Sequence, residues 1–150
     1  MSPGIIALFV GAGILFLAAM ALVVVTVTRA IGYHRAIRDR EAALAGAPIG
    51  VGLIEGIHRT LWTYGSGPPG GGAPHLYRFD GRVETEDGRQ FTSRVERYLS
   101  VLERRDFQEG TLRPVHYAPG REEEAVFVTD PAAAAEAQRV LAVVQARHRR

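Results

Sequence analysis

The sequence of 150 residues contains no cysteine, no lysine and no asparagine. Without cysteine the chain can form neither disulfide bonds nor thiolate metal sites, and its cysteine usage does not indicate a redox compartment. Because lysine is absent, all 18 of the strongly basic residues are arginine. The joint absence of lysine and asparagine is typical of a GC-rich genome. The formal net charge is only +2, so the charge balance does not indicate a nucleic-acid partner.

Charged side chains are also missing from the first 28 residues, where residues 5–28 form one unbroken apolar run. As a helix these about 24 residues would be about 36 Å long, at ~1.5 Å per residue. Crossing the hydrocarbon core of a bilayer takes about 20 residues. The run therefore predicts a single transmembrane anchor over residues 1–28.

Two other interpretations of this run are a buried core helix and a cleaved signal peptide. A soluble core helix rarely continues this long without a polar side chain. Residues 19–21 resemble a small-x-small cleavage site, but no positive region precedes the run, and apolar residues continue beyond that site. We therefore favour an uncleaved anchor.

Four arginines flank only the carboxyl end of the run: Arg29, Arg35, Arg38 and Arg40. The positive-inside rule then places the amino terminus outside and residues 29–150 in the cytoplasm. The same arginines are candidates for contact with anionic lipid headgroups at the membrane interface.

Small residues within the run and helix formers after it suggest two further features. Ala7 and Gly11 form a small-xxx-small pair, which permits close packing of a second transmembrane helix. After the membrane, residues 29–46 favour a helical juxtamembrane stalk, which Gly46 and Pro48 would end.

From residue 47 the pattern changes to that of a small β domain over residues 47–130. Its clearest element is a hairpin over residues 76–95, with Asp87 and Gly88 as the turn. A Gly/Pro-rich stretch, residues 64–75, predicts a flexible loop. We expect Tyr77, Phe79 and Val83 on one face of the first strand, and Arg78, Arg82 and Glu84 on the other.

The remaining segments complete the predicted fold. Residues 96–107 favour a short helical turn, and residues 110–118 and 124–130 favour strands, the first with Pro114 at an edge or bulge. Thr129 and Asp130 before Pro131 predict the start of a helix over residues 131–150. The fold class is therefore one N-terminal transmembrane helix, a barrel-like antiparallel domain of four or five strands, and a C-terminal helix.

The order of these motifs resembles the bacterial family called domain of unknown function 3592. The residues that carry the resemblance are Asp87, Gly88 and Phe91 in the hairpin, and Gly110, Val115, Tyr117 and Pro119 in a later strand. The resemblance covers residues 47–131 and implies a small β domain on a membrane anchor, and hence a bacterial inner-membrane location. It implies no activity.

The polar residues do not form a catalytic or metal-binding pattern. The five histidines lack short ligand spacing, although strands could bring His58 and His116 together. The serines lack a nucleophile-elbow context. The acidic run at residues 121–125 is typical of a solvated loop that protects a sheet edge. We therefore expect no catalytic, cofactor or metal site.

Two non-enzymatic functions follow. The first is an accessory protein that presents its cytoplasmic β domain to a membrane-protein partner or to a second copy of itself. The alternative is a tethered barrel that binds single-stranded nucleic acid or another polyanion, although carboxylates are mixed among its basic residues. The residues that could do so are Arg78, Arg82, Arg94, Arg97, Arg104 and Arg105, with Tyr77 and Tyr98 as stacking surfaces.

Overall fold

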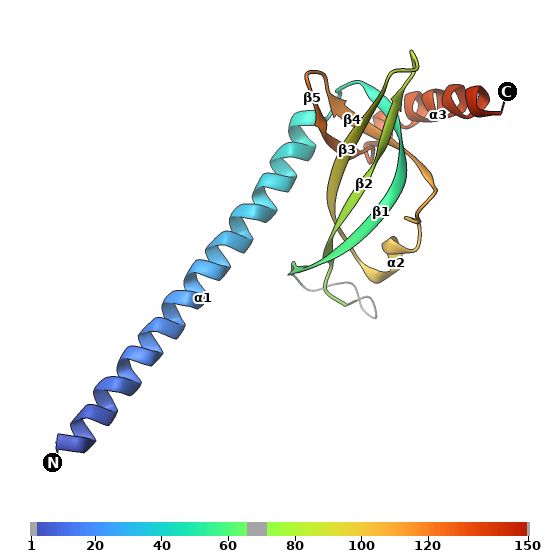
Figure 1. The fold of residues 1–150 in the computed structure, drawn as a ribbon. Helices are drawn as coiled ribbons and strands as arrows, with labels where there is room; N and C mark the ends of the chain where they lie inside the picture. Colours follow the sequence, from blue (N-terminus) through green and yellow to red (C-terminus); the bar gives the residue numbers. More distant parts are fainter. Residues whose placement is uncertain (1–2, 66–71, 150) are drawn as a thin grey trace. The chain divides into compact units, whose positions relative to one another are not determined.

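The computed structural model describes residues 3–65 and 72–149, and the side chains of residues 13–65 and 72–149 (Figure 1). The chain divides into two compact units, residues 1–36 and residues 37–150. The first helix, α1 (Pro3–Leu44), begins in the first unit and ends in the second. Most of the predicted flexible loop, including residues 66–71, lies outside the described residues.

The first unit is a single helix whose apolar side chains are exposed. Within residues 13–36 these include Phe16 and Leu22, which have no core to pack against. The hydroxyls of Thr26 and Thr28 each donate to a backbone carbonyl four residues earlier at 2.8 Å, which satisfies their polarity inside the helix. By length and composition the helix could cross a membrane as an anchor or serve as a signal sequence. The side chains of Ala7 and Gly11 lie outside the described residues.

The second unit is built on five strands that close into a barrel in the order β1-β2-β3-β5-β4. Neighbouring strands are antiparallel, except that β3 and β5 are parallel and joined at the single pair Arg94 and Glu124. The strands are β1 (Ile49–Thr63), β2 (His75–Thr85), β3 (Gln90–Leu99), β4 (Leu112–Ala118) and β5 (Arg121–Phe127).

These elements confirm the predicted fold class: an N-terminal apolar helix, a mostly antiparallel sheet and a C-terminal helix. One local prediction was wrong. The acidic run at residues 121–125 is no loop but the start of β5, because Arg121 pairs with Ala118 and Ala125 with Tyr117 across the tight turn at Gly120. The interpretation from charge alone failed because an outer barrel face accepts charged side chains as readily as a loop does.

The barrel interior is filled by aromatic and β-branched side chains. The ring of Phe79 lies 5.1 Å from that of Phe127 and 5.3 Å from that of Phe107, which comes from the segment after β3. Tyr77 and Val83 are buried beside Phe79, as the alternation in the hairpin predicts. Gly81 is required in this strand, because a Cβ there would meet the backbone oxygen of Leu53 at 2.2 Å.

The strands differ in length, and this leaves one end of the barrel to be closed by a loop. The pairing of β1 with β4 stops at Leu53, whereas its pairing with β2 continues to Thr63. The segment that follows β3 closes this end. It contains the short helix α2 (Val101–Arg104) and then Phe107, which packs on the core.

The C-terminal helix covers part of the barrel near its other end. A 3-10 turn (Pro131–Ala133), capped by the Asp130 side chain at 2.9 Å, leads into α3 (Ala134–His148). Val140 and Val144 of α3 are almost fully buried in a second core cluster that includes Val51 of β1. Figure 1 shows α3 and the β2–β3 turn at one end of the barrel, and α2 with the end of β1 and the start of β2 at the other.

Candidate interaction surfaces

Three of the six arginines expected to bind a polyanion, Arg78, Arg82 and Arg94, pair with carboxylates. Arg82 lies 2.8 Å from Glu55, and other pairs of this kind are Arg94 with Asp80 at 2.8 Å and Arg78 with Glu96 at 3.4 Å. The two tyrosines expected to stack on bases are also engaged. The Tyr77 side chain is buried in the core, and the Tyr98 ring lies 6.0 Å from that of Tyr64. These five residues therefore do not form the continuous basic and aromatic face that binding of a single-stranded polyanion uses.

An open groove of about 610 Å³ runs over the place where β3 meets β5. We call it the seam groove. Its charged lining holds five carboxylates but only two guanidinium groups. Those groups belong to Glu55, Asp80, Glu96, Glu123 and Glu124, and to Arg40 and Arg94; Thr92 and Ser93 add hydroxyls.

The arginines predicted to lie at the membrane interface divide between the two units. Arg29 and Arg35 are exposed on the helix of the first unit, and Arg38 is exposed in the second. Arg40 instead lines the seam groove, with its guanidinium 3.9 Å from the Glu96 carboxylate. Helical spacing alone could not show that this arginine faces the barrel.

The structure does not bring His58 and His116 together. His116 lies on β4 opposite Ile49, nine residues before His58 along β1, a separation of about 30 Å at ~3.3 Å per residue. The His58 ring lies 3.3 Å from Asp80, whereas buried His116 uses Nδ1 to contact the Ala47 carbonyl at 2.7 Å. Within residues 3–65 and 72–149, no three His, Asp or Glu side chains form a potential metal site.

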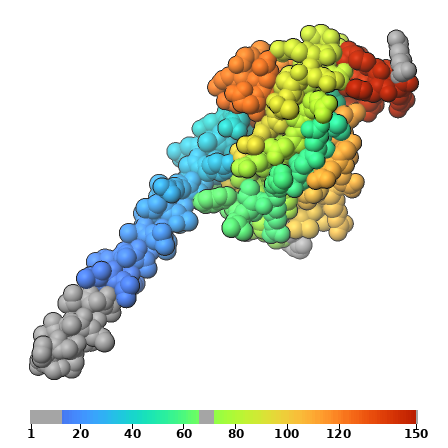
Figure 2. All heavy atoms as spheres, in the orientation of Figure 1, coloured from blue at the N-terminus to red at the C-terminus, as the bar shows by residue number. Residues whose placement is uncertain are grey.

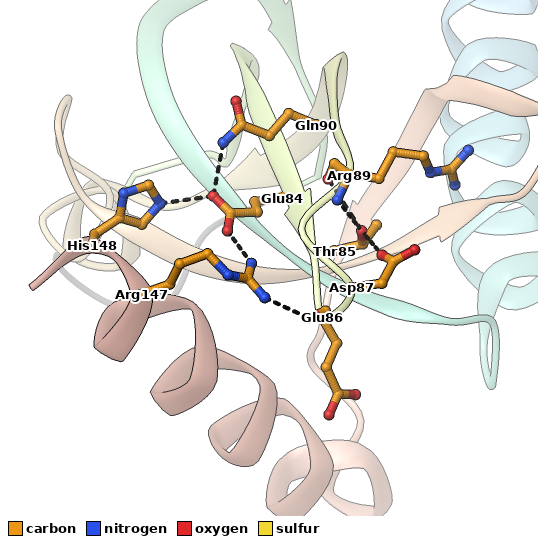
Figure 3. A network of polar contacts seen from close by, with 8 residues as sticks. All are labelled: Glu84, Thr85, Glu86, Asp87, Arg89, Gln90, Arg147 and His148. Atoms are coloured by element: carbon orange, nitrogen blue, oxygen red, sulfur yellow. Dashed lines mark hydrogen bonds and ion pairs between the residues drawn. The ribbon is translucent and has the colours of Figure 1, made fainter. Parts of the chain in front are cut away.

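The end of the barrel near α3 carries a polar network that the sequence did not indicate (Figure 3). Glu84 lies on the outer face of β2, as predicted, but it is buried there because residues at the end of α3 cover it. Its carboxylate accepts hydrogen bonds from Arg147, from His148 at 2.7 Å and from Gln90 at 2.9 Å. This cover comes from a contact across more than 60 residues, which strand alternation cannot reveal.

The ionisation of Glu84 reflects two opposing effects. Burial opposes the charged form and would raise the pKa, but the hydrogen bonds from Arg147, His148 and Gln90 together outweigh it. The net result is a pKa below the ordinary value of a glutamate. Glu84 is therefore an ionised side chain whose hydrogen bonds connect the end of α3 to β2.

Further ion pairs surround this network at the same end of the barrel. Glu86 pairs with Arg139 of α3, and Arg89 lies 2.7 Å from Glu122 of β5. Hydrogen bonding from Arg139 lowers the pKa of Glu86, and the Thr85 hydroxyl does the same for the pKa of Asp87. At the α3 end these carboxylates and arginines thus contact one another within the domain.

The opposite end exposes large apolar side chains, which we call the α2 rim. On the described part of the second unit, most of the exposed large apolar residues gather here. Leu61 is completely exposed, and Val101 and Leu102 are each 55% exposed. Figure 2 shows the end of β1, in green, projecting from the barrel. The α2 rim consists of Leu61, Trp62, Tyr64, Val101 and Leu102.

Strand pairing and one ring contact place the residues of the α2 rim at the same end. Thr63 pairs with His75, and His75 in turn pairs with Leu99, so the end of β1 is two strands away from the end of β3. The Tyr64 ring contacts the Tyr98 ring, one residue before Leu99. Ser100 then caps α2, and its side chain and that of Glu103 form a reciprocal capping box.

Comparison of the chain with protein-family models, with curated proteins and with solved structures finds no match. The resemblance to domain of unknown function 3592 therefore stays a prediction. Sequence reasoning missed both the seam groove and the α2 rim. A usable signal existed for the rim, because Leu61, Trp62, Val101 and Leu102 form two short apolar groups next to predicted turns.

Proposed function

We propose that this chain is a non-enzymatic, membrane-anchored accessory protein that presents a cytoplasmic β-barrel to a membrane-protein partner. Residues 1–28 would span the bacterial inner membrane with the amino terminus outside. The barrel would then meet the cytoplasmic segments of other membrane proteins. The apolar helix α1 supports the anchor, since it is long enough to cross the bilayer.

The seam groove is the observation that carries this proposal. Its lining has an excess of carboxylates over guanidinium groups and is open to solvent. Cytoplasmic segments next to transmembrane helices are enriched in lysine and arginine. Four groove carboxylates pair with arginines of the second unit, so a basic partner segment would take over these ion pairs. These carboxylates belong to Glu55, Asp80, Glu96 and Glu124.

Charge reversal in the groove tests the proposal. In the double variant E55R/E123R, two exposed groove carboxylates become cations, and we expect loss of a specific membrane partner after gentle detergent extraction and affinity purification. The matched control E109R/E136R makes the same charge change at exposed positions outside the groove and should retain the partner. Recovery of the wild-type chain alone and monomeric would contradict the proposal, as would equal loss from both variants.

The proposed topology has a separate test. A tag at the carboxyl terminus should remain unlabelled by an impermeant reagent on whole cells and become labelled after permeabilisation. The protein isolated from membranes should retain residues 1–28. Labelling on intact cells, or a mature chain that begins near Val23, would exclude the anchor with a cytoplasmic domain.

The same purification separates a protein partner from a polyanion. Binding to a polyanion weakens steeply as salt rises, because neutralised phosphates recover their counterions. The groove contact is also electrostatic, so a nuclease step before elution distinguishes the two. A partner that survives nuclease treatment supports the protein interaction, and material lost with nuclease supports the polyanion alternative.

A further inference from the structure

We infer that the α2 rim contacts the lipid headgroup region of the membrane to which the chain is tethered. This inference goes beyond the proposed function, because it concerns lipid and a different surface from the seam groove. It gives the barrel a second attachment to the membrane besides α1. The contact would fix which way the seam groove faces.

The side chains of the α2 rim have the composition of a membrane interface. Trp62 is the only tryptophan of the chain, and Tyr64 lies two residues beyond it. Tryptophan and tyrosine concentrate at the level of lipid headgroups, where one part of the ring is apolar and another is polar. Leu61, Val101 and Leu102 supply exposed aliphatic groups that can enter the acyl boundary.

The charges around the α2 rim suit an anionic surface. Residues 59–65 and 97–106 contain the four arginines Arg59, Arg97, Arg104 and Arg105, against two carboxylates. One of those carboxylates, Glu103, accepts hydrogen bonds from the Ser100 backbone and hydroxyl at 2.8 and 2.7 Å. Basic residues near an anionic membrane are attracted to its surface.

The size of the α2 rim favours lipid over a protein. A stable protein interface usually buries about 800 Å² on each partner and involves roughly 20–30 residues a side. The rim offers five large apolar side chains, which is too few for such an interface but enough for shallow insertion. Because the domain is tethered, even a weak lipid contact forms at high effective concentration.

The lengths of the chain segments permit the contact. From Thr28 to Leu44 the helix rises about 24 Å, at ~1.5 Å per residue. From Ile49 to Thr63, β1 extends over about 46 Å, at ~3.3 Å per residue. Because β1 is longer than this part of the helix, its far end is within reach of the bilayer surface.

Because Trp62 is the only tryptophan, its fluorescence reports the α2 rim alone. The full chain is purified and reconstituted in vesicles of anionic lipids, with or without bromine on the upper part of the acyl chains. Bromine quenches tryptophan only at contact, so we expect emission to fall by roughly half, as for a side chain at the interface. In the control W62F/Q138W the tryptophan lies on the exposed face of α3, and the emission should stay unchanged.

A second variant removes the insertion while keeping the barrel. The triple variant L61S/V101S/L102S changes only exposed side chains, so Trp62 should escape quenching while the circular dichroism of the barrel is retained. Persistent quenching in this variant, equal quenching of the α3 tryptophan, or no quenching of the wild type would overturn the inference. Trp62 that is shielded from iodide but unaffected by brominated lipid would also overturn it, in favour of a protein contact.

The outcome is independent of the proposed function. The vesicles contain only the purified chain and lipid, so quenching does not depend on a partner protein. Failure of E55R/E123R to lose a partner would leave the lipid result standing. Failure of the quenching test would leave the partner experiment standing.

Discussion

The two ends of the barrel differ in how their charged and apolar side chains are arranged. At the α3 end, Glu84, Glu86 and Glu122 each contact an arginine, and α3 covers the apolar residues beneath. At the α2 end, large apolar side chains remain in solvent around a short capped helix. Stabilising contacts and candidate binding contacts are thus separated in space. Substitutions at the two ends should therefore have opposite consequences for folding and for membrane contact.

The largest expected effect is on the core under α3. The double variant V140A/V144A removes two nearly fully buried side chains, and each truncation should cost about 2 kcal/mol in the free energy of unfolding. Urea unfolding of the full chain in detergent, followed by near-ultraviolet circular dichroism, measures this from the buried aromatic rings. The control V143A alters a 37% exposed neighbour and should change stability by less than about 0.5 kcal/mol. Similar costs for buried and exposed valines would show that α3 is not docked.

The second largest loss of stability is expected when the charge of buried Glu84 at the α3 end is removed. The variant E84Q keeps the shape of the side chain but removes the charge that Arg147 and His148 contact. We expect a loss of about 2 kcal/mol at neutral pH, the range of hydrogen bonds to charged groups. The variant E86Q alters an exposed carboxylate and should have a much smaller effect in the same unfolding experiment.

The difference between wild type and E84Q should depend on pH. Since the pKa of Glu84 is lowered by folding, its stabilisation is complete above the unfolded pKa of about 4.3 and is lost as pH falls through the folded value. The two proteins should therefore converge in acid. A difference that stayed constant from pH 7 down to about pH 3 would contradict an ionised Glu84.

At the α2 end a smaller effect is expected from the helix cap. The variant S100A removes the capping box of α2 and should cost about 1 kcal/mol. The variant S100T keeps the hydroxyl and should retain most of the stability in the same assay. Equal loss in both variants would indicate that packing around Ser100, and not its hydrogen bonds, holds α2.

The smallest effect on stability is expected at the α2 rim itself. The double variant V101S/L102S replaces two exposed side chains and should change the free energy of unfolding by less than about 0.5 kcal/mol. A cost above about 1.5 kcal/mol would mean that the rim belongs to the core, which would remove the contrast between the two ends.

The features that the sequence predicts are those set by interactions between residues close together in the chain. The apolar helix, the Asp87-Gly88 turn and the Asp130-Pro131 helix start are local features, and all of them appear in the structure. The inward positions of Tyr77 and Phe79 follow from strand alternation. These signals act within a few residues, so one sequence is enough to read them.

The rest depends on contacts between distant segments. The parallel pairing of β3 with β5, the burial of Glu84 under the end of α3 and the position of Arg40 at the seam groove each join residues that lie at least 30 positions apart. Neither periodicity nor composition specifies which distant partner a charged strand residue will meet. The seam groove is a product of this topology and could not be predicted beforehand, whereas the α2 rim left a local signal in two short apolar groups of the sequence.

The part of β1 that extends beyond β4 has a consequence for how the length of this domain could change. Beyond Leu53, β1 continues without β4 beside it, and its last residues pack little against the interior. Residues could therefore be added to or removed from this arm in matched pairs with β2 without repacking the aromatic interior. One barrel could in this way carry a longer or shorter arm through a change in a single hairpin.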